Sequence, residues 1–171
     1  MGKIYNFKCY WNTNFENKYT NDEMHKGKFI LKKKGWFEGI IPNPNDPEKM
    51  GSLVFGYYYP DSFIYLYQIP TGSPTVPFLF TGLKTTDGYD GSFDVFRSGY
   101  EQKRIAKAYI VTEKRKKNDS DLESEIKMYK KALDPTGIDF YKKIKSDKDN
   151  MESKAKEFKL RRHYIEVPST N

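Results

Sequence analysis

Cysteine and histidine are scarce in this chain of 171 residues, which has one cysteine and two histidines. A single cysteine, Cys9, excludes an intramolecular disulfide and a zinc site built from cysteines. His25 and His163 are far apart, and neither has a second histidine or a carboxylate at metal-ligand spacing. We therefore expect no metal, haem or other cofactor, and we interpret Cys9 as a small buried hydrophobic residue in a strand.

Long apolar runs and catalytic motifs are also lacking. No run approaches about 18 apolar residues, and residues 1–7 contain no apolar signal core. The sequence has no Gly-rich phosphate loop, nucleophile elbow or nucleotide fingerprint. We expect a soluble, cytoplasmic protein without a membrane span. An enzyme is the third choice among function classes because no catalytic residues stand out, and the pattern predicts no oligomeric state.

Aromatic residues, by contrast, make up 16% of the chain and lie mostly before Glu113. In residues 26–69 they alternate with other residues, and a period of two places every second side chain on one face of a strand. The aromatic face of two central strands contains Leu53, Phe55, Tyr57, Tyr59, Phe63, Tyr65, Tyr67 and Ile69. We expect a closed barrel to turn this face inward.

Eight short runs with this alternation predict the fold. They are residues 5–11, 28–33, 36–41, 53–59, 63–69, 76–82, 89–97 and 104–112. Turn signals at Lys34-Gly35 and Asp87-Gly88 favour hairpins between neighbouring runs. The glycines at 39, 56, 82 and 91 are expected to bend the strands and to leave gaps in them. Residues 1–112 are therefore predicted to form an up-and-down antiparallel β-barrel of about eight strands, with a sandwich as the alternative.

The pattern becomes helical after residue 112. Residues 120–123 form a capping box, and the stripe of Leu122, Ile126, Tyr129 and Leu133 follows it at helical spacing. Asp134-Pro135 ends this helix, and further helices are expected from there and from residue 146 or 147. Because the helices are too polar for a core of their own, residues 113–171 are predicted to be a helical extension packed outside the barrel or across one end.

Residues 26–112 resemble the calycin superfamily, which includes lipocalins and fatty-acid-binding proteins. The resemblance rests on the segments GWFEG at 35–39 and GSLVFG at 51–56 and on the meander of aromatic strands. It implies a barrel that encloses a small hydrophobic ligand without catalysing a reaction.

Binding of a small hydrophobic or amphipathic ligand in the barrel lumen is therefore the first function predicted. The expected lining residues are Trp36, Phe55, Tyr57, Tyr65, Tyr67, Phe93 and Tyr109. Arg97 shares a strand face with Phe93, so it is a candidate for holding an acidic group, or it reaches water at the strand end. Ordered water is an alternative partner for the tyrosine hydroxyls, and a closed core with hydroxyls at the rim is another.

An interaction module is the second function predicted. The net charge is +7, and basic runs occur at residues 32–34, 114–117 and 161–162. Together with exposed tyrosines these runs allow protein contact or nonspecific contact with a polyanion such as nucleic acid. Acidic residues interleave with the basic ones in the helical part, which is also typical of an ordinary solvated surface.

Overall fold

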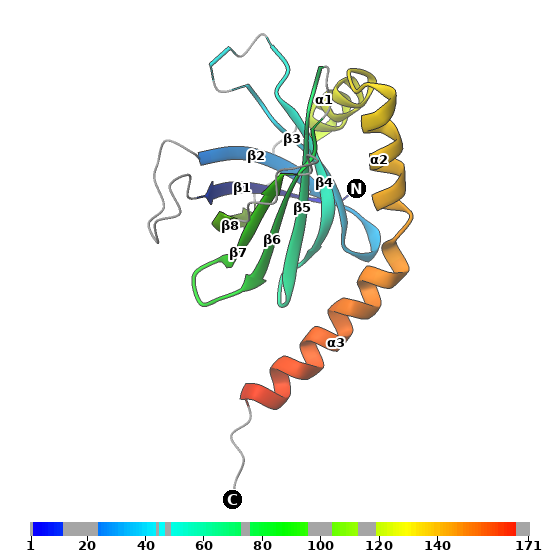
Figure 1. The fold of residues 1–171 in the computed structure, drawn as a ribbon. Helices are drawn as coiled ribbons and strands as arrows, with labels where there is room; N and C mark the ends of the chain where they lie inside the picture. The colour runs from blue at the N-terminus through cyan, green and yellow to red at the C-terminus, as the bar shows by residue number, and fades with distance from the viewer. Residues whose placement is uncertain are drawn as a thin grey trace, which may run out of the picture.

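The structure, a computed structural model, describes residues 2–11, 24–43, 45–46, 49–72, 76–95, 104–112 and 119–166. Eight antiparallel strands pair in chain order and the last pairs with the first, which closes the barrel (Figure 1). The strands are β1 (Lys3–Trp11), β2 (Met24–Leu31), β3 (Trp36–Ile41), β4 (Ser52–Tyr59), β5 (Phe63–Pro70), β6 (Phe78–Lys84), β7 (Tyr89–Val95) and β8 (Arg104–Thr112). The predicted up-and-down antiparallel barrel is confirmed.

The two ends of the barrel differ in the length of their connections. Tight turns join β2 to β3, β4 to β5 and β6 to β7 at one end. In the first of these, Lys34 has φ 58° and ψ 32° and Gly35 has φ 76°. Positive φ at both central residues is the geometry of a type I′ hairpin. The described parts of the longer connections, residues 42–43, 45–46, 49–51, 71–72 and 76–77, lie at the opposite end.

Aromatic contacts between strands that are not neighbours identify the inner face of the barrel. The ring of Tyr58 on β4 lies 5.3 Å from that of Tyr5 on β1 and 5.6 Å from that of Tyr89 on β7. The hydroxyls of Tyr58 and Tyr89 are 2.9 Å apart, and Tyr89 donates to the carbonyl of Pro60 at 2.7 Å. These phenols therefore have protein partners at the tight-turn end. The buried residues of this interior are Tyr5, Phe7, Cys9, Phe29, Phe37, Ile41, Val54, Tyr58, Ile64, Leu66, Phe80, Tyr89, Phe93, Ala106 and Ala108.

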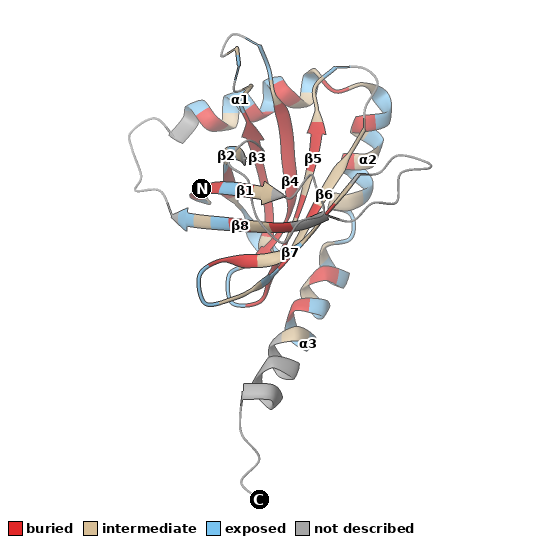
Figure 2. Cartoon of the chain, turned by 60° about the vertical axis from the view of Figure 1, so that its left-hand side comes forward, coloured by how far each residue is buried: buried red, intermediate tan, exposed pale blue. Residues whose placement is uncertain are grey.

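Three helices follow the barrel and cover the outer face of β3, β4 and β5 (Figures 1 and 2). They are α1 (Asp119–Lys131), α2 (Pro135–Lys145) and α3 (Lys148–Glu166). Asp134 caps α2, because its side chain accepts a hydrogen bond from the Gly137 amide at 2.8 Å. The buried residues that the helices and the connection between α1 and α2 contribute to this second core are Leu122, Ile126, Tyr129, Leu133, Tyr141, Met151 and Ala155. The stripe predicted for the first helix thus lies against the barrel.

The predicted direction of the aromatic face is wrong. Trp36, Phe55, Tyr57, Tyr65 and Tyr67 were expected inside the barrel, but they belong to the core between the barrel and the helices. Trp36 and Phe55 contact the ring of Tyr141 on α2, with ring centroids 5.9 and 5.2 Å apart. An eight-stranded barrel has an interior that side chains can just fill. The more aromatic face of β4 and β5 lies outside, where the helices bury it.

Glycines do not leave gaps for a ligand in the strands. A Cβ atom on Gly91 would lie 1.7 Å from the carbonyl oxygen of Thr81, and one on Gly56 would lie 1.8 Å from that of Tyr65. Gly39 and Gly82 are similarly crowded by neighbouring atoms. At Gly39, Gly56 and Gly91 the nearest atoms belong to the backbone of a neighbouring strand, and at Gly82 they belong to the ring of Phe80, so the prediction of open space beside these glycines is wrong.

Candidate functional site

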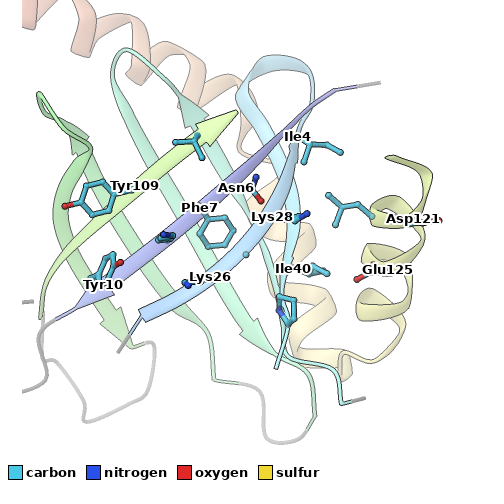
Figure 3. A pocket seen from close by; sticks show the side chains of 15 residues that line it. Ile4, Asn6, Phe7, Tyr10, Lys26, Lys28, Ile40, Tyr109, Asp121 and Glu125 are labelled. Carbon is cyan, nitrogen blue, oxygen red and sulfur yellow. The ribbon is translucent and has the colours of Figure 1, made fainter. Parts of the chain in front are cut away.

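A groove lies on the outside of the barrel, over the strands that the helices leave uncovered (Figure 3). Its floor consists of the outer faces of β1, β2 and β8, and the first turns of α1 form one wall. The volume is about 1000 Å³. Its lining residues are Ile4, Asn6, Phe7, Lys8, Tyr10, Lys26, Gly27, Lys28, Ile40, Pro42, Tyr109, Val111, Asp121, Leu122 and Glu125.

The strand register arranges these side chains in rows across the floor. Tyr109 on β8 pairs with Lys8 on β1, and Lys8 pairs with Lys26 on β2. The adjacent row runs from Val111 through Asn6 to Lys28 in the same way. Each row therefore begins with an apolar or aromatic side chain on β8 and ends with a lysine on β2.

The basic part of the groove is concentrated at Lys8 and Lys26. The two lysines are directly opposite each other in an antiparallel pair, and both are exposed. Neither forms an ion pair with any residue that the structure describes. Like charges in this position destabilise a sheet unless an anion lies between them. Asp121 and Glu125 are on the α1 wall, so the acidic groups of the groove come from a different element.

The opposite side of the groove is aromatic. Tyr10 and Tyr109 meet edge to face, with ring centroids 5.9 Å apart. Tyr109 is 39% exposed and Val111 is 62% exposed, although both lie in strands. Lys107 lies beside this pair and forms ion pairs with Asp87 at 2.8 Å and with Asp90 at 3.3 Å. The groove thus combines exposed apolar surface with a pair of cations.

Under the helices, Glu38 forms a buried charge cluster. This residue is 0% exposed, and Lys130 donates to its two carboxylate oxygens at 2.7 and 2.8 Å. Tyr141 donates to the same carboxylate, and Lys32 lies 3.7 Å away. Burial alone would raise the pKa of Glu38, but the hydrogen bonds from Lys130 and Tyr141 and the nearby positive charges lower it. Glu38 is therefore ionised and joins β3 to α1 and α2.

Tyr59, Tyr67, Tyr141 and Cys9 are not suited to proton transfer at neutral pH. Burial raises the pKa of Tyr59 and that of Tyr67 to about 12, each aided by nearby negative charge. Burial and the Glu38 carboxylate also raise the pKa of Tyr141. Burial raises the pKa of Cys9 to about 12, and the residue is 4% exposed, as the sequence predicts for a small buried hydrophobic side chain. These groups keep their protons, which does not suit a general base or a thiolate nucleophile.

The residues predicted to line a lumen are divided among three places. Phe93 points into the barrel and is 5% exposed. Tyr109 lies on the outside and lines the groove. The other five pack under the helices, and Arg97 lies outside the described residues.

Sequence reasoning missed the lysines of the groove. No role was assigned to Lys8 or Lys26 from the sequence. Their signal is the alternation of Ile4, Asn6, Lys8 and Tyr10 on the face opposite the interior, which mixes apolar and basic side chains instead of being uniformly polar.

Among the residues that the structure describes, no three His, Cys, Asp or Glu side chains gather as a metal site would require. No helix in the described ranges has the length and apolarity needed to cross a bilayer. Comparisons of the chain with protein-family models, with curated proteins and with solved structures gave no match.

Proposed function

We propose that the protein is a non-catalytic binding protein for a small amphipathic carboxylate. The ligand lies in the groove outside the barrel, and the observation that carries this proposal is the Lys8–Lys26 couple, which has no ion pair with the described residues and lies beside exposed apolar surface. The ligand class is among those expected from the sequence, but the site differs, because aromatic and aliphatic side chains pack together in the described interior.

Charge and shape both support such a ligand. A carboxylate between Lys8 and Lys26 removes the repulsion between them and accepts hydrogen bonds from both ammonium groups. It also stays away from Asp121 and Glu125 on the α1 wall. The apolar part of the ligand lies along Tyr109 and Val111 and removes these exposed side chains from water, which favours binding. The groove volume is within the range typical of small-molecule sites.

Titration calorimetry with dodecanoate and with dodecanol tests the proposal. The double variant Lys8→Gln/Lys26→Gln is expected to bind dodecanoate about tenfold more weakly, since each partly exposed ion pair contributes roughly 0.5–1 kcal/mol. Dodecanol affinity is expected to stay unchanged, because the alcohol has no charge for the lysines to hold.

The matched control is Lys142→Gln/Lys143→Gln, which removes two exposed lysines from α2. It is expected to bind both molecules as the wild type does. Equal loss of dodecanoate binding in the two double variants would show that only net charge matters and would overturn the proposed site.

A single-stranded polyanion is the second candidate. The Tyr10–Tyr109 pair beside Lys8 and Lys26 offers a ring for stacking and cations for phosphate. Adding a short oligothymidylate to the same calorimetry separates the two ligands. Oligonucleotide binding that exceeds dodecanoate binding and falls steeply with salt would favour the polyanion.

A further inference from the structure

A second cavity opens at the end of the barrel that carries the long connections. It has a volume of about 680 Å³ and is bordered by Ile41, Met50, Ser52, Gln68 and Pro70 among others. At the opposite end, hydrogen bonds join Tyr58, Tyr89 and the carbonyl of Pro60. We call the end that borders the cavity the mouth of the barrel.

Two buried polar side chains stand at this mouth. Gln68 is 5% exposed and Ser52 is 6% exposed, and both come from strand positions that face inward. Placing an amide and a hydroxyl in an apolar interior costs free energy unless they are hydrogen-bonded. They do bond each other, since Gln68 Nε2 donates to Ser52 Oγ at 3.1 Å. Gln68 Oε1 in turn contacts Nδ1 of His25 at 3.1 Å.

The chemistry of these groups gives the chain of hydrogen bonds a direction. An amide oxygen only accepts, so His25 Nδ1 carries the proton of the first bond. An amide nitrogen only donates, so Ser52 accepts in the second bond. The Ser52 hydroxyl can therefore still donate its own proton. Among the described residues, no acceptor forms a hydrogen bond with that proton.

The frame around Ser52 is held in place by backbone contacts. Thr71 donates from its amide at 3.1 Å and from its hydroxyl at 2.9 Å to the carbonyl of Gly51. The Gly51 amide donates to the Tyr129 hydroxyl on α1 at 3.2 Å. The peptide groups on both sides of Gly51 are thus held by hydrogen bonds, which favours a preformed site.

We propose that the mouth of the barrel is a second binding site, for a neutral ligand that has an apolar ring or chain and a carbonyl oxygen. The carbonyl accepts the proton of the Ser52 hydroxyl. The apolar part lies against Ile41, Met50 and Pro70. This ligand class differs from the anion of the groove, because the donor invoked at the mouth is the Ser52 hydroxyl, whereas the groove offers a pair of opposed lysines, of which Lys26 also borders the second cavity.

The test uses acetophenone as the probe and ethylbenzene, which lacks the carbonyl, as its partner. Both are titrated into ¹⁵N-labelled protein while amide and side-chain NH₂ resonances are followed. Acetophenone is expected to shift the Gln68 side-chain NH₂ and the backbone amide of Ser52. Ser52→Ala is expected to weaken acetophenone binding about fivefold and to leave ethylbenzene binding unchanged.

Ser92→Ala is the matched control, since Ser92 is on β7 at a position facing away from the interior. It is expected to change neither affinity. The proposal would be overturned if saturating acetophenone caused no shifts at Gln68 and Ser52, or if Ser52→Ala weakened the binding of both probes equally. The groove is tested separately with dodecanoate, and Lys8, unlike Lys26, lines the groove without lining the second cavity, so Lys8→Gln alone distinguishes failure at one site from failure at the other.

Discussion

Glu38 connects the barrel to its helices through a buried carboxylate. Glu38→Gln keeps the shape but leaves Lys130 without its counter-ion, and we expect the free energy of unfolding at pH 7 to fall by about 2 kcal/mol. Urea denaturation followed by circular dichroism measures the loss.

The same carboxylate predicts a dependence on pH. Because the pKa of Glu38 is lower in the folded protein than the ordinary 4.5, its contribution is complete above that value and is lost as the pH falls through the folded-state pKa. The difference in stability between wild type and Glu38→Gln should therefore shrink on acidification towards pH 3. A difference that stays constant from pH 7 to pH 3 would contradict the assignment of an ionised Glu38.

The β2–β3 hairpin contains a residue in an unfavourable conformation. Lys34 adopts φ 58°, which costs a residue with a Cβ free energy, and Asn tolerates this region better. Lys34→Asn is expected to raise the melting temperature by about 2–4 °C, even though the exposed contact of Lys34 with Asp149 is lost. Calorimetric melting checks this. Lys33→Asn, in the same turn but without a positive φ, should give no such gain, and an equal gain in both variants would refute the conformational explanation.

Strands and turns were more predictable than the direction in which the strands face. The run at 104–112, the Lys34-Gly35 hairpin and the start of α2 at Pro135 all follow from local signals that the structure confirms. In β4 and β5 both faces are largely apolar, so alternation separates the two faces without saying which is inside. The needed signal was in the helices: the stripe from Leu122 to Leu133 required an apolar partner, and the aromatic face supplies it.

The groove was less predictable than the fold because it depends on pairings between distant segments. Lys8 and Lys26 are brought together only by the register of β1 and β2, and Tyr109 reaches them only because β8 closes on β1. A single sequence contains no local pattern for barrel closure. The position of Asp121 on the α1 wall of the groove depends in addition on where α1 packs against the barrel.

The helices are required to cover the barrel. Trp36, Leu53 and Phe55 are at most 1% exposed in the whole chain, and all belong to the core shared with the helices. A chain that ends at residue 117 exposes these side chains to water, and we expect it to bind an apolar dye and to aggregate. Size-exclusion chromatography and dye fluorescence measure both. A monomeric, dye-negative fragment with cooperative unfolding would show that the barrel is independent of the helices.

The position of the ligand on the molecule is the central claim, and a ¹H–¹⁵N titration with dodecanoate tests it most directly. We expect the largest shifts at the amides of Asn6, Lys8 and Lys26 along the groove, with little change at interior residues such as Phe37 and Phe80. Large shifts at those interior amides, or no shifts along β1 and β2 at saturating dodecanoate, would contradict a binding site outside the barrel.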